Sequence, residues 1–431
     1  MTTAACAVVE RLEAAWRRSD LIFSLLAPEA LRERPIALRH PFVFYVGHLP
    51  AFGWNQIGRA TLGRPSLGPE LDDLFERGID PLSENDPAAK RAPAWPELGE
   101  ILAYRDRVRA ALRDMADEVA DARIYDVVIE HELMHHETLL YMIQRLDRAK
   151  RRRPEGVPAP VAGGPRDARA PVRVPEGDAT LGADFDRAPF GWDNEFPEHR
   201  VRVAAFEVDA RPVTNARFRE FVDAGGYANR ALWSEEGWAA KEAYGLRRPL
   251  FWTDGATAVR TLFDDVPFAT AENWPVTVSW IEANAYARWR GARLLTEPEY
   301  HRAAFGMPDG GRRAHPWGDE PPAPRRANVD FAHWSPTPAG TRPEGASAFG
   351  VEDLVGDGWE WTGTPFAPFP GFRAWVASYP GYSADFFDGK HFVLLGGSFA
   401  TAKDLVRRSF RNWFQPNYPF VFAKFRCARS L

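Results

Sequence analysis

Two histidines four residues apart, His131 and His135, have the spacing in this chain that most directly predicts metal chemistry. They lie in residues 121–146 (DARIYDVVIEHELMHHETLLYMIQRL), where apolar residues recur at helical spacing. On a helix, side chains four residues apart share one face, so two imidazoles can bind one metal ion. The neighbouring His136 projects about 100° away on such a helix, so we do not expect it to be a ligand.

A third histidine, His48, lies in the apolar segment FVFYVGHLPAFGW, where burying an unpartnered imidazole is costly. We therefore expect it to complete a three-histidine site, with Glu132 and Glu137 available to accept hydrogen bonds from the rings. Three neutral histidines leave a divalent metal with open positions, and iron(II) and zinc both suit such ligands.

The residues leave two alternatives open. The segment HELMH formally matches the HExxH pattern of zinc proteases, with Glu132 as the general base. The histidines are equally compatible with a packed or surface pair on an amphipathic helix, without any metal.

The composition limits the classes of function. The 431 residues predict two domains, and the net charge of −5 gives no overall basic field for nucleic acid. Only two cysteines exclude a disulfide framework, and no signal peptide or membrane-spanning apolar segment is visible, so we expect a cytoplasmic protein that does not bind membranes. The 16 Trp and 29 Phe predict aromatic-lined cavities in a loop-rich fold.

The hydrophobic periodicity and the local composition of the chain predict where the domains lie. Residues 1–150 carry repeated helical patterns, which indicate a helical bundle. Residues 151–170 are rich in Pro, Gly and Ala and read as a linker. From residue 171 to residue 431, short β-like runs alternate with long loops and two helical patterns, at 215–224 and 280–290, which favours an irregular α+β domain.

The last third of the chain offers a different kind of site. The runs GWEWT, GGS and FRNWF place Trp and Phe near the polar Asn412, a combination that suits an aromatic pocket for a cation or a flat heterocycle. The structural alternative is that these rings hold a loop-rich fold together.

Short motifs give both domains a family resemblance. The second domain resembles the formylglycine-generating-enzyme/sulfatase-modifying-factor domain, and the first resembles a DinB-like helical bundle. The resemblance implies an α + (α+β) protein, in which a DinB-like four-helix bundle precedes a C-type-lectin-like domain. The motifs that carry it are residues 212–215 with Phe218 and Phe221, 275–280, 293–299, 316–319, 356–361, 396–398 and 425–426.

The pairing of these domains with His48, His131 and His135, together with GWDNE at 191–195, is similar to the ergothioneine and ovothiol sulfoxide synthases. That resemblance implies a mononuclear non-heme Fe(II) centre held by the three histidines. It also implies that O2 is used to join a chalcogen to an imidazole carbon of histidine or hercynine. Asn412 and Trp413 match the motif that contacts the imidazole substrate. Formylglycine generation is not expected, because that activity needs a cysteine pair near the C-terminus and only Cys427 is there.

The chain departs from this family at several positions. Met134 stands where the family usually has Gln, and Phe366 and Phe369 stand where it usually has tyrosines. Phe414 and Tyr418 replace the Asp and Arg that hold a γ-glutamylcysteine donor. Without these charge partners a zwitterionic donor is poorly held, so the pattern resembles the selenoneine synthase branch, which couples a neutral selenosugar to hercynine.

These resemblances set the expected ligands. The substrates are hercynine, O2 and a selenosugar, with Asn412, Trp413, Phe414, Phe366 and Met134 as substrate-binding residues and no catalytic residue assigned. The first alternative is an ergothioneine-type hercynine sulfoxide synthase that uses cysteine, γ-glutamylcysteine or another thiol. More distant alternatives are a zinc DinB-type transferase or hydrolase and a non-catalytic binding module.

Overall fold

The chain divides into two compact units, Met1–Glu155 and Gly156–Leu431. The computed structural model describes residues 3–76, 95–119, 121–165, 169–377, 379 and 381–431. Part of the segment expected to be a linker packs into the second unit, where Trp274 Nε1 donates to the carbonyl of Val161 at 2.7 Å. None of the helices in the described ranges is long and apolar enough to cross a membrane.

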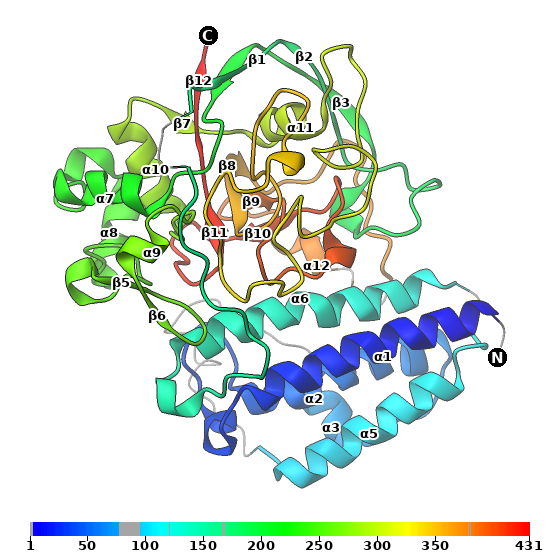
Figure 1. Ribbon diagram of the computed structural model, residues 1–431. Coiled ribbons are helices and arrows are strands. Elements are labelled where there is room, and N and C mark those ends of the chain that lie inside the picture. The colour runs from blue at the N-terminus through cyan, green and yellow to red at the C-terminus, as the bar shows by residue number, and fades with distance from the viewer. Residues whose placement is uncertain (1–2, 77–94, 120, 166–168, 378, 380) are drawn as a thin grey trace. The chain divides into compact units, whose positions relative to one another are not determined.

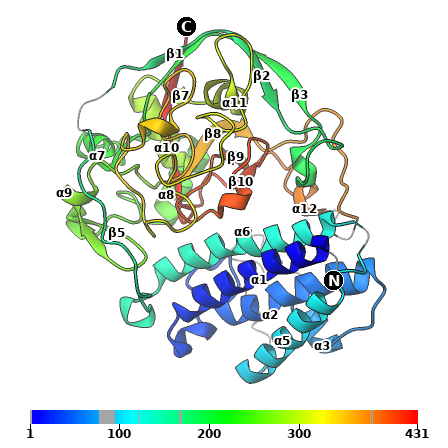
Figure 2. The same ribbon diagram turned by 45° about the vertical axis from the view of Figure 1, so that its right-hand side comes forward.

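The described part of the first unit is a bundle in which four long helices lie side by side (Figures 1 and 2). They are α1 (Thr3–Ser24), α2 (Phe42–Gly53), α5 (Leu98–Asp114) and α6 (Arg123–Arg145), accompanied by the short α3 (Pro69–Leu74). The helical patterns in the sequence anticipate α1, α5 and α6, because apolar residues recur at helical spacing in each. In the structure, α1 and α5 keep an exposed side, whereas α6 has no exposed residue.

Helix α2 gave no such pattern, because all twelve of its residues are buried and its apolar side chains point in every direction. It also contains Pro50, which lacks the N–H of an ordinary helical residue. The chain continues beyond α2 as a π-helical segment, Trp54–Thr61, whose first five residues are buried and whose last three are exposed.

The second unit is a mixed α+β fold with two four-stranded sheets, ordered β1-β4-β12-β7 and β10-β9-β8-β11. Two further sheets have two strands each, β2-β3 and β5-β6. The strands are β1 (Val172–Val174), β2 (Gly177–Leu181), β3 (His199–Val203), β4 (Phe206–Val208), β5 (Ala258–Arg260), β6 (Asp265–Pro267), β7 (Arg293–Leu294), β8 (Trp359–Pro365), β9 (Phe392–Leu395), β10 (Asn412–Phe414), β11 (Ala423–Lys424) and β12 (Cys427–Ser430).

The helices of this unit are short, and α7, α8, α10 and α11 each begin at a Ser or Thr cap. The Ser279 and Glu282 side chains form a capping box at the start of α10, and Thr296 and Glu299 do the same for α11. These caps satisfy backbone N–H groups that would otherwise be unpaired at each helix start. The helices are α7 (Asn215–Asp223), α8 (Glu235–Ala243), α9 (Phe268–Ala271), α10 (Trp280–Trp289), α11 (Glu297–Phe305) and α12 (Gly381–Ala384).

Buried ion pairs hold the long connections of the second unit in place. Arg426 donates through Nε and Nη2 to both carboxylate oxygens of Glu360, and neither side chain is exposed. Lys424 lies beside them and donates to the carbonyl of Gly356 at 2.8 Å. Fully hydrogen-bonded pairs of this kind tie strands and loops together where few regular elements exist.

Candidate metal centre

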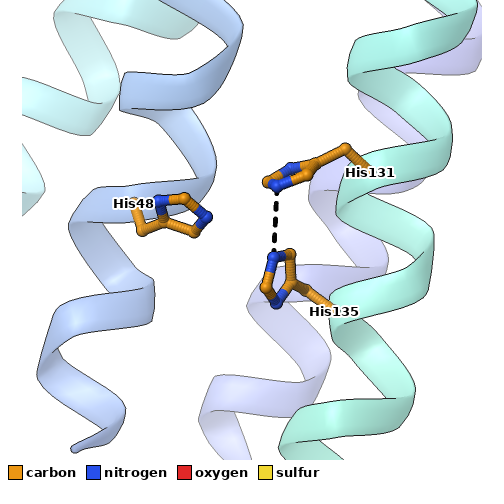
Figure 3. Close-up of side chains that lie close together, drawn as sticks. All are labelled: His48, His131 and His135. Carbon is orange, nitrogen blue, oxygen red and sulfur yellow. Dashed lines mark hydrogen bonds between the residues drawn. The ribbon is translucent and has the colours of Figure 1, made fainter. Parts of the chain in front are cut away.

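Three histidines meet inside the helical bundle. His48 projects from α2 toward His131 and His135, which project from one face of α6 (Figure 3). One ring nitrogen from each lies within 4.8 Å of those of the other two. Among the described residues this is the one group of three or more His, Cys, Asp or Glu close enough to share a metal ion.

The spacing of the two α6 histidines suits a shared ion. Their Nε2 atoms are 3.1 Å apart. Two nitrogens bound at about 2.1 Å and at right angles around one metal lie about 3.0 Å apart, so this pair already has ligand spacing. Both Nδ1 atoms are buried and make no hydrogen bond among the described residues.

The third ring is oriented by a backbone carbonyl. His48 Nδ1 lies 2.8 Å from the carbonyl oxygen of Phe75, which can only accept, so the proton is on Nδ1 and the lone pair on Nε2. Burial lowers the pKa of His48 to about 4, and it lowers the pKa values of His131 and His135 well below the usual value. All three rings are therefore neutral near pH 7, which is the form that binds a metal.

Aromatic rings surround the histidines. Phe52 stacks on His131 with centroids 3.5 Å apart, and Phe44 stacks on His48 at 4.9 Å. The ring of Tyr45, which is 2% exposed, lies 5.5 Å from that of His135. This apolar packing restricts the rotation of each imidazole and lowers the polarity around the centre.

The neighbouring acidic residue does not act as the sequence analysis expected. Glu132 accepts a hydrogen bond from Ser19 of α1, whose hydroxyl oxygen is also 2.7 Å from Nε2 of His136. Burial raises the pKa of Glu132 to about 7. The Nδ1 atoms of His131 and His135 make no hydrogen bond among the described residues, so Glu132 does not orient these two imidazoles as expected. His136 is fully buried in the same network and lies outside the three-histidine group.

The second unit brings two of the predicted substrate residues together. Trp413 of β10 stacks on Phe366 with centroids 4.3 Å apart and an 8° angle between the rings. Tyr382 meets Trp413 edge-on at 5.3 Å, and Phe386 lies at 5.6 Å. We call Phe366, Tyr382, Phe386 and Trp413 the aromatic cluster. Phe366 is 1% exposed, so it supports Trp413 from behind, whereas Trp413 is only half-buried.

Asn412 and Phe414 lie on the other side of β10, because successive strand residues alternate. The Asn412 side-chain oxygen accepts from the backbone N–H of Trp413 at 2.8 Å. Phe414 stacks on Tyr418 at 5.3 Å, away from the aromatic cluster. Met134 is half-buried on α6, one residue before His135.

Charged residues that the sequence analysis did not single out lie beside the aromatic cluster. Arg411 forms an ion pair with Glu297, with Nε and Oε1 2.8 Å apart and both side chains almost fully buried. Its guanidinium carbon lies 4.9 Å from the centroid of Phe366. Because the two partners are far apart in sequence, the pair had no local signal that could have revealed it.

Comparison with known proteins relates both units to described families. Residues 11–145 match the DinB superfamily, and residues 159–431 match the sulfatase-modifying factor enzyme 1-like domain. The hercynine oxygenase of Mycolicibacterium smegmatis is 38% identical over 370 residues, which cover 84% of each chain. That of Mycolicibacterium thermoresistibile is 39% identical over 374 residues, covering 85% of this chain and 81% of the relative.

A fungal relative is longer. Ergothioneine biosynthesis protein 1 of Neurospora crassa is 32% identical over 508 aligned positions, covering 97% of this chain and 57% of that protein. The two families that this chain matches, and the names of these relatives, agree with the resemblance seen in the sequence.

Proposed function

Since the chain belongs to the family of the hercynine oxygenases, we propose that it is an Fe(II)- and O2-dependent enzyme that forms a carbon–chalcogen bond at the imidazole C2 of hercynine. The observation that carries the proposal is the cluster of the buried His48 and His131 with the half-buried His135, whose nitrogens have the spacing of metal ligands. An all-nitrogen set of three leaves room for substrates at the same ion.

In this proposal the three histidines hold iron, and the bound metal supplies the redox chemistry with O2. The chain's own part is to keep the imidazoles neutral, because their burial disfavours protonation. The stacked rings of Phe44 and Phe52 fix the ligand planes and exclude water. Met134, one residue before His135, offers an apolar side chain toward bound substrate.

Hercynine carries a trimethylammonium group and an imidazole, and the second unit has suitable partners for both. We propose that the half-buried face of Trp413, supported by Phe366, binds the quaternary ammonium. The Asn412 side-chain oxygen accepts from backbone, so its amide nitrogen remains to donate to the substrate. Phe414 contributes apolar surface for the chalcogen donor.

A thiol is the donor that the relatives support best. The related proteins are named for hercynine oxygenation and ergothioneine biosynthesis, so we place sulfur donors such as cysteine or γ-glutamylcysteine first, with a hercynine sulfoxide as product. This reverses the order of preference given by the sequence alone. A selenosugar stays the second candidate on one observation: Phe414 and Tyr418 stack on each other and offer no carboxylate or guanidinium to a charged donor.

The test is product mass after aerobic incubation of the Fe(II)-loaded full chain with hercynine. Cysteine, γ-glutamylcysteine and a selenosugar are compared at matched concentration. A hercynine sulfoxide formed with either thiol supports the first reading. Selenosugar turnover at least about a hundredfold faster than either thiol establishes the second, the margin expected when buried charges lack partners.

Metal analysis and oxygen uptake in the same samples separate the remaining classes. Zinc at the histidines with no O2 consumption would support a transferase or hydrolase. Tight binding of hercynine without metal or turnover would support a binding module.

A further inference from the structure

The orientation of His48 depends on a carbonyl that lies outside its own helix. Its Nδ1 donates to the oxygen of Phe75, the residue at the C-terminal end of α3. This contact fixes the tautomer that leaves Nε2 as the ligand atom. The position of α3 therefore controls the direction in which His48 presents its lone pair.

One buried carboxylate ties α3 to its surroundings. Asp72 is fully buried, and its side chain accepts hydrogen bonds from the hydroxyl of Tyr104 on α5, at 2.6 Å, and from Ser66. Its backbone carbonyl accepts from Asn55 Nδ2, in the π-helical segment, at 3.3 Å. The bonds from Asp72 thus reach α5, the segment after α2 and the turn that precedes α3.

The fit between α3 and α2 leaves little room for adjustment. Gly47 precedes His48, and a Cβ at Gly47 would lie 2.4 Å from a carbon of the Phe75 ring. Phe75 packs against this glycine and is also fully buried. A shift of α3 therefore moves the Phe75 carbonyl away from His48, because the ring has no free space in which to compensate.

We propose that Asp72 is a positioning residue for the metal centre: by anchoring α3 to Tyr104 and Ser66, it holds the Phe75 carbonyl against His48. The inference rests on the proposed metal role of the three histidines. Asp72 touches neither metal nor substrate and acts through the backbone three residues further along the chain. Partners one step removed from a metal ligand typically change metal affinity by about 10- to 100-fold when they are lost.

The experiment measures binding of Co(II), used as a spectroscopic probe, to the full chain by chelator competition and by its visible absorption. We expect Asp72→Ala to bind Co(II) about 10- to 100-fold more weakly. Its spectrum is expected to shift toward that of His48→Ala, because the His48 ring is no longer held. Asp72→Asn should restore most of the affinity, since its amide oxygen still accepts from Tyr104 and its amide nitrogen can donate to Ser66.

The matched control is Asp73→Ala, on the same helix. The Asp73 side chain is 74% exposed and lies 3.8 Å from Arg59, so this change should leave both affinity and spectrum unaltered. Tyr104→Phe removes a single hydroxyl and should weaken Co(II) binding in the same direction by a smaller factor. If Asp72→Ala does not fold, Tyr104→Phe serves as the test of whether Asp72 positions the metal centre.

The outcomes separate the inference from the proposed function. Equal Co(II) binding by the wild type and His131→Ala would overturn the metal site itself. If His131→Ala loses Co(II) while Asp72→Ala keeps wild-type affinity and spectrum, the site stands and Asp72 has only a structural role. Unchanged affinity and spectrum in folded Tyr104→Phe, where Asp72→Ala is unfolded, would overturn the inference as well.

Discussion

The helical bundle and the second unit position their functional groups in different ways: the bundle uses regular helices, and the second unit uses loops and short elements. In the bundle, two regular helices present three histidines, and the i, i+4 spacing of α6 alone brings two of them within 3.1 Å. In the second unit, Trp413 lies on an edge strand of three residues and meets rings from loops and a one-turn helix. Regular helices let local sequence fix a site, whereas loops need many distant contacts to do the same.

The two units also differ in how they treat charge. The metal centre is built from neutral groups whose protonation is suppressed by burial. The second unit buries opposite charges in pairs, such as Arg426 with Glu360 and Arg411 with Glu297. We therefore expect changes in the bundle to affect metal binding first and changes in the second unit to affect stability first.

The largest effect should come from His135→Ala. Two remaining imidazoles rarely hold iron(II) against competing ligands, so this variant should lose bound iron and all turnover. The measurement is iron content per chain after desalting, together with product formation. His136→Ala is the control and should keep its metal, because His136 contacts Ser19 and lies outside the three-histidine group. Full iron occupancy in His135→Ala would remove it from the ligand set.

Glu360→Ala should lower the free energy of unfolding by about 3–5 kcal/mol, because it leaves Arg426 and Lys424 buried without their carboxylate. The free energy of unfolding from urea titration measures it. The comparison variant is Glu344→Ala, whose pair with Arg325 is more than half exposed, and it should cost no more than about 1 kcal/mol. Similar losses in both variants would contradict the contrast between buried and exposed pairs.

Trp413→Ala should weaken the binding of hercynine by about 30-fold. This factor corresponds to about 2 kcal/mol, the value for a desolvated cation on an aromatic face. Histidine, which lacks the quaternary group, should be affected much less. Calorimetric titration of both ligands into the metal-loaded protein gives the two dissociation constants. Equal weakening of both would assign Trp413 to packing within the aromatic cluster.

The smallest effect concerns His301 of α11. Burial, together with Arg408 and Arg411, lowers the pKa of this buried histidine well below its value in an unfolded chain. Below pH 6.5 the unfolded state therefore gains a proton that the folded state refuses, so stability falls as pH falls. His301→Phe removes this contribution. The free energy of unfolding of this variant, relative to that of the wild type, should therefore rise by about 1.4 kcal/mol when the pH is lowered from about 7.5 to about 5.5. Urea unfolding at both pH values tests it, and a constant difference would show that His301 does not titrate on unfolding.

Local sequence patterns accounted for the regular parts of the molecule. The spacing of His131 and His135 anticipated their shared face, and family motifs anticipated the α + (α+β) organisation. The patterns gave no helix around His48, because a segment buried on every side has no polar face to mark its period. They also misplaced Glu132, whose partner Ser19 comes from a helix more than a hundred residues away.

The sheet β1-β4-β12-β7 constrains how the polypeptide acquires its structure during synthesis. Its third strand, β12 (Cys427–Ser430), pairs with both β4 and β7, so the early strands cannot join β7 without it. A ribosome must therefore make nearly all of the second unit before this sheet can close. The bundle belongs to the unit Met1–Glu155, so it can assemble earlier. Late closure through distant strand pairs predicts that the second unit folds slowly and sets the pace of maturation.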